Sequence, residues 1–180
     1  MRSFSTFIIS TLLSVAVAVG SELPFSESAK QLLNIESLSA RDVEVLDAFV
    51  FRMDNKKHSF KKKKNFINYL NDQAHRDILL SYEQLTSFEE LVSEVKYNCL
   101  TGSTFFALLL ELYDVSYKVI ETNYHMFILI EDEGRQYLLD ATDPIQGFET
   151  NAATVELRLA EYKAKNQQVF KNNTVSFQFD

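Results

Sequence analysis

The 180-residue sequence has few of the residues that break or cross-link a chain: two prolines, four glycines, one cysteine and no tryptophan. So little proline and glycine excludes a collagen-like or linker-rich protein. One cysteine and three scattered histidines lack the spacing of metal ligands, so we expect no metal and no other cofactor. The remaining composition, 46% apolar and 24% charged, is that of an ordinary globular protein.

Basic residues are in the minority, since 18 basic against 25 acidic side chains give a net charge of −7. This balance argues against nucleic-acid binding, which requires a basic face. The local exception is the run Lys56–Lys64, which gathers six lysines. Charge runs of this kind are usually solvated, and a surface for an acidic partner or a membrane is the alternative.

The first twenty residues have the pattern of a secretory signal peptide. Arg2 supplies the positive start, Phe7–Val19 is mostly apolar, and Ala18–Gly20 offers small residues at the cleavage positions. The apolar run is shorter than the roughly 20 residues of a membrane-spanning helix. We therefore expect cleavage near Ser21 and a secreted or periplasmic protein without stable membrane insertion, with an uncleaved anchor as the alternative.

Residues 21–180 are long enough for one domain with a sizeable core. Apolar spacing and capping residues predict a mostly helical part over 21–96, including a helical tendency over 78–82. Residues 97–150 combine an apolar helix with a strand and a β-hairpin, and 151–180 combine an amphipathic helix with a short strand. We expect an α+β fold in which the cysteine-bearing helix packs on an antiparallel sheet. The expected strands are 115–120, 124–130, 135–140 and 175–179.

Cys99 opens the apolar stretch 98–112, which is predicted to be a buried helix. Asn98 is a good N-cap and would place Cys99 in the first turn, where the helix dipole stabilises a thiolate. Gly102 and Ser103 are small, so another element can approach this turn closely. An exported chain with one cysteine has no internal disulfide, so this thiol is either intermolecular, buried and inert, or reactive.

A histidine and an aspartate follow on two apolar runs that we expect to form adjacent strands. His125 lies 26 residues after Cys99 in the middle of the first predicted strand, and Asp140 closes the second. On adjacent strands the carboxylate can fix the tautomer and orientation of the imidazole. Thiol, imidazole and carboxylate in this order are the parts of a cysteine nucleophile with its base and its orienting acid.

Plainer interpretations exist for each of these residues. A histidine in an apolar run is commonly a core residue, and Asp140 and the nearby Asp143 are both suited to capping turns. Asp143 is the better placed of the two for the turn with Pro144. His58 and His75 precede the cysteine in polar segments, where no comparable geometry is implied.

Residues 97–147 resemble the core of the transglutaminase-like superfamily, a branch of the papain-like cysteine enzymes. That family has a cysteine opening a buried helix, a histidine on the following strand pair and an aspartate in a segment similar to 139–144 (LDATDP). The resemblance implies a papain-like fold in which Cys99 is the nucleophile, His125 the general base and acid, and Asp140 the orienting residue.

The sequence also departs from that family. Tyr124 and Met126 flank the histidine, where the family often has glycine before and alanine-tryptophan after, and the chain has no tryptophan for an oxyanion or substrate-tunnel role. Oxyanion stabilisation would then fall to the backbone N–H of Cys99, with Tyr97 or Asn98 as further candidates.

The expected function is that of an exported cysteine-dependent acyl-transfer enzyme, which acts on amide bonds of a protein or peptide through a thioester. Water as the acceptor makes it a peptidase or amidase, which we favour, and a lysine amine makes it a cross-linking transglutaminase. Two other classes stay open. One is a non-catalytic binding or scaffold module that retains the fold, and the other is a redox-sensing thiol.

Overall fold

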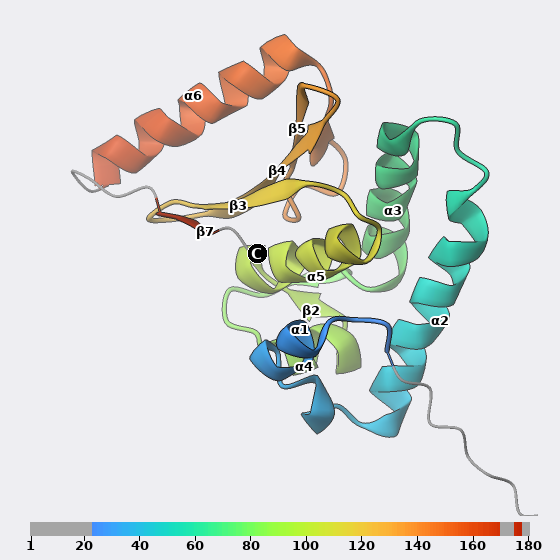
Figure 1. Cartoon of the computed structure of the whole chain (residues 1–180). Coiled ribbons are helices and arrows are strands. Elements are labelled where there is room, and N and C mark those ends of the chain that lie inside the picture. The colour runs from blue at the N-terminus through green and yellow to red at the C-terminus, as the bar shows by residue number, and fades with distance from the viewer. Residues whose placement is uncertain (1–22, 170–174, 178–180) are drawn as a thin grey trace, which may run out of the picture.

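The computed structural model describes residues 23–169 and 175–177, which form an α+β protein with helices on both faces of one antiparallel sheet (Figure 1). The strand order in this five-stranded sheet is β6-β5-β4-β3-β7. The α+β class and the antiparallel sheet of the sequence prediction are therefore confirmed. The strands are β3 (Tyr117–Glu121), β4 (Met126–Asp132), β5 (Arg135–Leu139), β6 (Phe148–Glu149) and β7 (Val175–Phe177).

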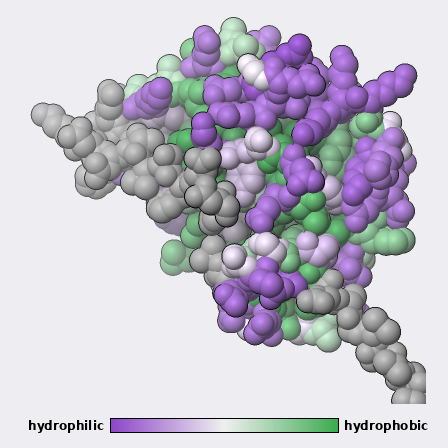
Figure 2. Space-filling model, in the orientation of Figure 1, coloured by the Kyte–Doolittle hydropathy of each residue, from purple (hydrophilic) through white to green (hydrophobic). Residues whose placement is uncertain are grey.

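The part of the chain before Cys99 is mostly helical, as predicted. Serine N-caps begin three of its helices: Ser26, Ser39 and Ser87 each accept a hydrogen bond from a backbone N–H in the first turn. The helices are α1 (Glu27–Leu32), a 3-10 turn (Ile35–Ser37), α2 (Ala40–Lys57), α3 (Lys63–Asp77) and α4 (Phe88–Ser93). The run Lys56–Lys64 spans the end of α2, the turn after it and the start of α3, where Figure 2 shows hydrophilic side chains.

The predicted helical tendency over 78–82 is wrong. After α3 the chain becomes the short strand β1 (Ser81–Tyr82), which pairs in parallel with β2 (Lys96–Tyr97). The backbone N–H groups of Leu80 and Ser81 donate to the Val95 carbonyl at 3.2 and 3.0 Å and hold the segment extended. This pairing is non-local, so the propensity of 78–82 itself gave no sign of it.

Helix α5 (Cys99–Leu112) packs on one face of the sheet and is covered on its other sides by the helical half (Figure 1). Its middle is fully buried, with Phe105 and Phe106 wholly inaccessible. The Phe105 ring lies 5.6 Å from the ring of Phe49 on α2, and Phe106 lies 6.1 Å from the ring of His75 on α3. Helix α5 is thus fixed between the sheet and the helices.

Helix α6 (Ala152–Val169) covers the opposite face of the sheet (Figure 1). The core on this side is much smaller: buried Val155 packs with Phe127 of β4 and Leu138 of β5. Partly buried Leu159 and Tyr162 extend the contact along the helix.

The expected signal peptide, residues 1–20, lies outside the described residues. Within the described ranges, no helix combines the length and apolar character needed to cross a membrane. The predicted last strand, 175–179, is present as β7 over the three residues that are described.

Candidate active site

Cys99 is the first residue of α5, as the sequence predicted, because Asn98 caps the helix. The Asn98 Oδ1 accepts the Thr101 backbone N–H at 2.8 Å, while the Asn98 N–H donates to Thr101 Oγ1 at 3.0 Å. This reciprocal pair fixes the helix start. Cys99 is a free thiol and is partly exposed, so its sulfur combines a helix N-terminus with access from solvent.

The segment after β5 packs directly on the first turn of α5. A Cβ built on Gly102 would lie 2.8 Å from the Cβ of Ala141 and 3.3 Å from Cδ2 of Tyr97, so only glycine fits this approach. The loop is closed by the Asp140 N–H, which donates to the Gly147 carbonyl at 2.9 Å. The expectation that a small Gly102 lets another element come close is confirmed, and that element is the one that carries Asp140.

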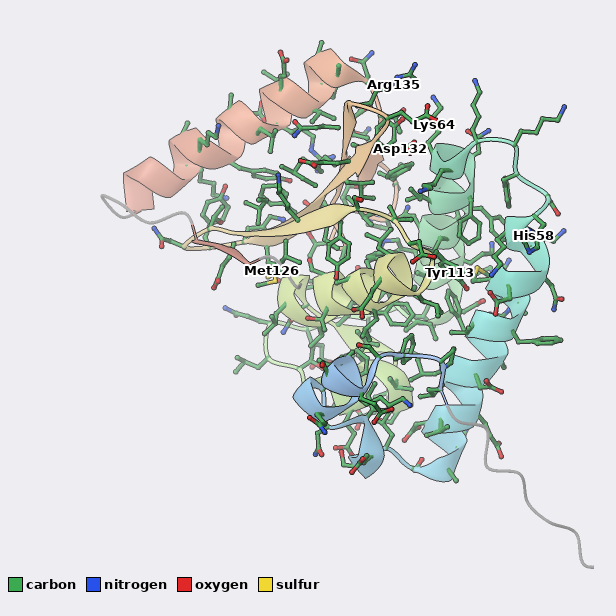
Figure 3. All side chains as sticks on the ribbon, viewed as in Figure 1. His58, Lys64, Tyr113, Met126, Asp132 and Arg135 are labelled. Carbon is green, nitrogen blue, oxygen red and sulfur yellow. The ribbon has the colours of Figure 1, made fainter. Side chains whose placement is uncertain are left out.

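His125 lies immediately before β4, so its predicted position in the middle of a strand is wrong. The residue belongs to a tight turn with Thr122, whose Oγ1 accepts the His125 N–H at 2.9 Å and donates to the His125 carbonyl at 2.8 Å. The next residue, Met126, is the first of β4, and Figure 3 shows it beside the N-terminal end of α5. Ser103 of α5 donates to the Met126 carbonyl at 3.3 Å, which ties the two elements together.

The turn and the loop bring His125 and Asp140 into contact. His125 Nε2 lies 2.9 Å from Asp140 Oδ2, and the histidine side chain is only 13% exposed. The other carboxylate oxygen accepts the Thr142 N–H at 2.9 Å and the Thr142 hydroxyl at 2.8 Å. Because Nε2 is held by the carboxylate, Nδ1 is the ring nitrogen left to face the Cys99 thiol, whose pKa is lowered by the neighbouring His125 side chain.

Two residues of α6 complete the environment of Asp140, and the sequence did not predict their role. The Tyr162 hydroxyl donates to Asp140 Oδ2 at 2.7 Å. Arg158 Nη2 lies 3.5 Å from the same oxygen and donates to the Tyr162 hydroxyl at 3.1 Å. A sequence signal existed: Arg158 interrupts the apolar stripe formed by Val155, Leu159 and Tyr162. A charged residue on such a face needs a buried partner.

The charges of the three residues are mutually stabilising. The hydrogen bond with His125 lowers the pKa of Cys99 against the effect of burial, with help from backbone N–H groups of Met126 and Leu100. Burial lowers the pKa of His125, but its bonds to Asp140 and Cys99 outweigh burial and raise it to about 9. Burial raises the pKa of Asp140, and its bonds, above all that to His125, hold that pKa well below the usual range. This arrangement favours a thiolate beside an imidazolium.

The two further oxyanion candidates are placed differently by the structure. The Asn98 side-chain nitrogen donates to the carbonyls of Gln84 and Thr86 at 3.2 and 3.5 Å, so this amide group is engaged in holding the start of α5. Tyr97 is buried, and burial raises the pKa of its hydroxyl. The Cys99 backbone N–H lies in the first turn of α5, where the N–H groups of a helix have no intrahelical carbonyl to which they can donate. Their roles in binding an oxyanion stay predictions.

The competing residues of the sequence analysis lie apart from the thiol. His58 is exposed at the end of α2 (Figure 3). The His75 ring packs at 6.0 Å from the ring of Tyr97, and burial lowers its pKa. Asp143 caps its own turn, with Oδ1 accepting the backbone N–H of Gln146 at 2.8 Å. Of the three histidines, His125 is the one that the structure brings to Cys99.

Among residues 23–169 and 175–177, no group of three or more histidine, cysteine, aspartate or glutamate side chains is arranged to hold a metal ion. Comparison with known proteins finds no family model that matches the chain. No curated protein and no solved structure matches it either.

Proposed function

We propose that the chain is a cysteine-dependent acyl-transfer enzyme that acts on amide bonds of proteins or peptides through a thioester, as a peptidase or amidase. We further propose that its core is a papain-like core of the transglutaminase-like type. Support for this core comes from a cysteine at the start of a buried helix that packs on an antiparallel sheet, with the histidine before β4 and the aspartate after β5. We also propose a secreted or periplasmic location, which the signal pattern of residues 1–20 supports.

The observation that carries the proposal is the grouping of Cys99, His125 and Asp140 at the start of α5, with His125 in contact with Asp140 and the pKa of Cys99 lowered by His125. A structural cysteine is normally buried in apolar surroundings, which raise the pKa of the thiol and leave it inert. Here the thiol is partly exposed, its pKa is lowered, and its partner is held by a buried carboxylate. This arrangement of side chains is typical of an activated cysteine nucleophile.

The arrangement of Cys99, His125 and Asp140 supports a two-step reaction. The Cys99 thiolate attacks the amide carbon, and the carbonyl electrons move to oxygen to form a tetrahedral intermediate. The C–N bond then breaks as the His125 imidazolium gives its proton to the leaving amine, and a thioester remains. His125 next takes a proton from water, which attacks the thioester and releases the acid and the Cys99 thiolate. Asp140 stays ionised and holds the ring in place.

Water is favoured over a lysine amine as the acceptor. A transamidating enzyme must exclude water from its thioester, because hydrolysis competes with the transfer. In the described structure Cys99 is partly exposed at the start of α5. We therefore expect a carboxylic acid and a free amine as the products.

The proposal is tested with a library of peptide amides and three proteins: the native chain, Cys99→Ala and His125→Ala. We expect amine release by the native chain, none by Cys99→Ala, and a decrease of about 10²–10⁴-fold for His125→Ala, the usual contribution of a general acid–base group. His58→Ala is the matched control and should retain full activity, since this histidine is exposed and distant from the thiol.

Two outcomes would replace the proposal. Isopeptide-linked products in the presence of a lysine peptide would make the protein a transglutaminase. An inert thiol together with no turnover of any peptide amide would leave a non-catalytic binding module.

A further inference from the structure

A cavity of about 460 Å³ lies beside the N-terminal turn of α5. Its size falls within the range of about 300–1,000 Å³ that is usual for ligand pockets. The walls are mainly apolar and come from four parts of the chain: the loop after α1, the start of α4, one side of α5, and strands β3 and β4. They include Leu33, Phe88, Leu100, Ala107, Val119 and Met126.

The cavity adjoins the nucleophile. Leu100 and Met126 both line it, and these two residues directly follow Cys99 and His125 in the chain. Figure 3 shows Met126 at the N-terminal end of α5, between the helix and the sheet. A group attached near a carbonyl bound at Cys99 would therefore lie beside the cavity.

One charged side chain breaks the apolar lining. Among the described residues that line the cavity, Glu121 at the end of β3 is the only ionisable one. Its partners across the sheet are Met126 on β4 and Val175 on β7, and no described side chain forms an ion pair with it. One acidic group in a cavity with mainly apolar walls favours a ligand with a hydrocarbon stem and a cationic tip, and disfavours an anionic tip.

We propose that this cavity is the substrate subsite for a side chain next to the scissile amide, and that it selects an aliphatic stem with a cationic end, as in lysine or arginine. The inference rests on the proposed acyl transfer at Cys99. The stem packs on Leu100, Val119 and Met126, and the cation pairs with Glu121. This assigns specificity to the junction of α5 with the edge of the sheet.

The test uses peptidyl chloromethyl ketones, which alkylate an active-site thiol irreversibly. Lysine, norleucine and glutamate are compared at each of the two positions before the reactive carbon. Lysine and norleucine have the same stem and differ by the terminal amine. We expect the lysine reagent to alkylate Cys99 about tenfold faster than the norleucine reagent, because the lysine amine adds one charge-assisted contact. The glutamate reagent should be the slowest.

Substitutions at the cavity make the test specific. Glu121→Gln should slow the lysine reagent to the rate of norleucine, whereas the matched control Glu111→Gln, at the far end of α5, should leave both rates unchanged. Thr104→Phe, which fills the cavity from α5, should slow the lysine and norleucine reagents alike and leave iodoacetamide unaffected. Thermal unfolding of each variant checks that the fold is intact.

The outcomes separate this inference from the proposed function. Fast alkylation that depends on His125 but proceeds equally with the lysine and norleucine reagents would overturn the proposed subsite. The proposed acyl transfer at Cys99 would still stand. A lysine preference that survives in Glu121→Gln would also overturn it. A thiol that reacts slowly with iodoacetamide and with every chloromethyl ketone would overturn the acyl-transfer proposal itself.

Discussion

The two faces of the five-stranded sheet are built very differently. On the α5 face the packing is apolar and continuous with the helical half, and it includes the wholly buried Phe105, Leu109 and Leu110. On the α6 face three buried side chains form a small core, and beside it Arg158 and Tyr162 reach the carboxylate of Asp140.

The two faces therefore contribute differently to the stability of the fold and to the reactivity of the Cys99 thiol. The nucleophile is carried by a helix whose middle is fully buried, so its position is determined by the main core. The acid that orients His125 is held instead by hydrogen bonds from a helix that contributes little apolar burial. We therefore expect the loss of core side chains on the α5 face to act mainly on folding, and the loss of hydrogen bonds on the α6 face to act mainly on the chemistry.

The largest expected effect comes from truncating matched leucines on the two faces. Leu109→Ala on α5 should lower the free energy of unfolding by about 4 kcal/mol, since this leucine is fully buried in a core that cannot collapse around the gap. Leu159→Ala on α6 is partly buried and should cost about 1 kcal/mol. Urea unfolding of both variants measures the contrast, and equal costs would show that the two cores are equivalent.

Gly102→Ala should have a smaller effect on folding and a large effect on the reactivity of the Cys99 thiol. The added methyl group would overlap Ala141 and push the loop that carries Asp140 away from α5. Overpacking of this kind costs about 1–3 kcal/mol. The reactivity of Cys99 at pH 6 should decrease together with stability, because His125 loses its carboxylate. The control is Gly134→Ala at the β4–β5 turn, whose site is open but has φ +77°, so it should lower stability alone.

A small change in stability is expected for Tyr162→Phe, which removes one hydrogen-bond donor from Asp140 and keeps the ring. Loss of this bond should cost about 1–2 kcal/mol at most and lower kcat for peptide amides by up to about tenfold. The KM should not change, because Tyr162 contacts the carboxylate and not the substrate. Tyr69→Phe on α3 is the control, and an equal loss of kcat there would contradict a positioning role for Tyr162.

Sequence reasoning was most accurate where the determinants are local. Asn98 predicts the start of α5, and alternating β-branched residues predict β3, because capping and side-chain alternation depend on immediate neighbours. The contact of His125 with Asp140 followed from two strands joined by a tight turn.

The sequence was less informative where the contact partners are distant. Tyr162 reaches Asp140 across 22 residues, and a periodicity analysis counts a tyrosine on an apolar stripe as core. The extended form of Ser81–Tyr82 depends on pairing with Lys96–Tyr97. The exact place of His125 was also missed, because the turn that Thr122 makes with it ends β3 before β4 begins.

The central claim is that His125 activates the Cys99 thiol, and the rate of iodoacetamide alkylation against pH tests it most directly. A lowered thiol pKa means that the reactive thiolate persists at lower pH, so the native chain should show an inflection well below the value of about 8.5 for an ordinary thiol. In His125→Ala the inflection should move up toward that value, while in His58→Ala it should not move. An inflection near 8.5, or no accessible thiol, in both the native chain and His125→Ala would contradict the account.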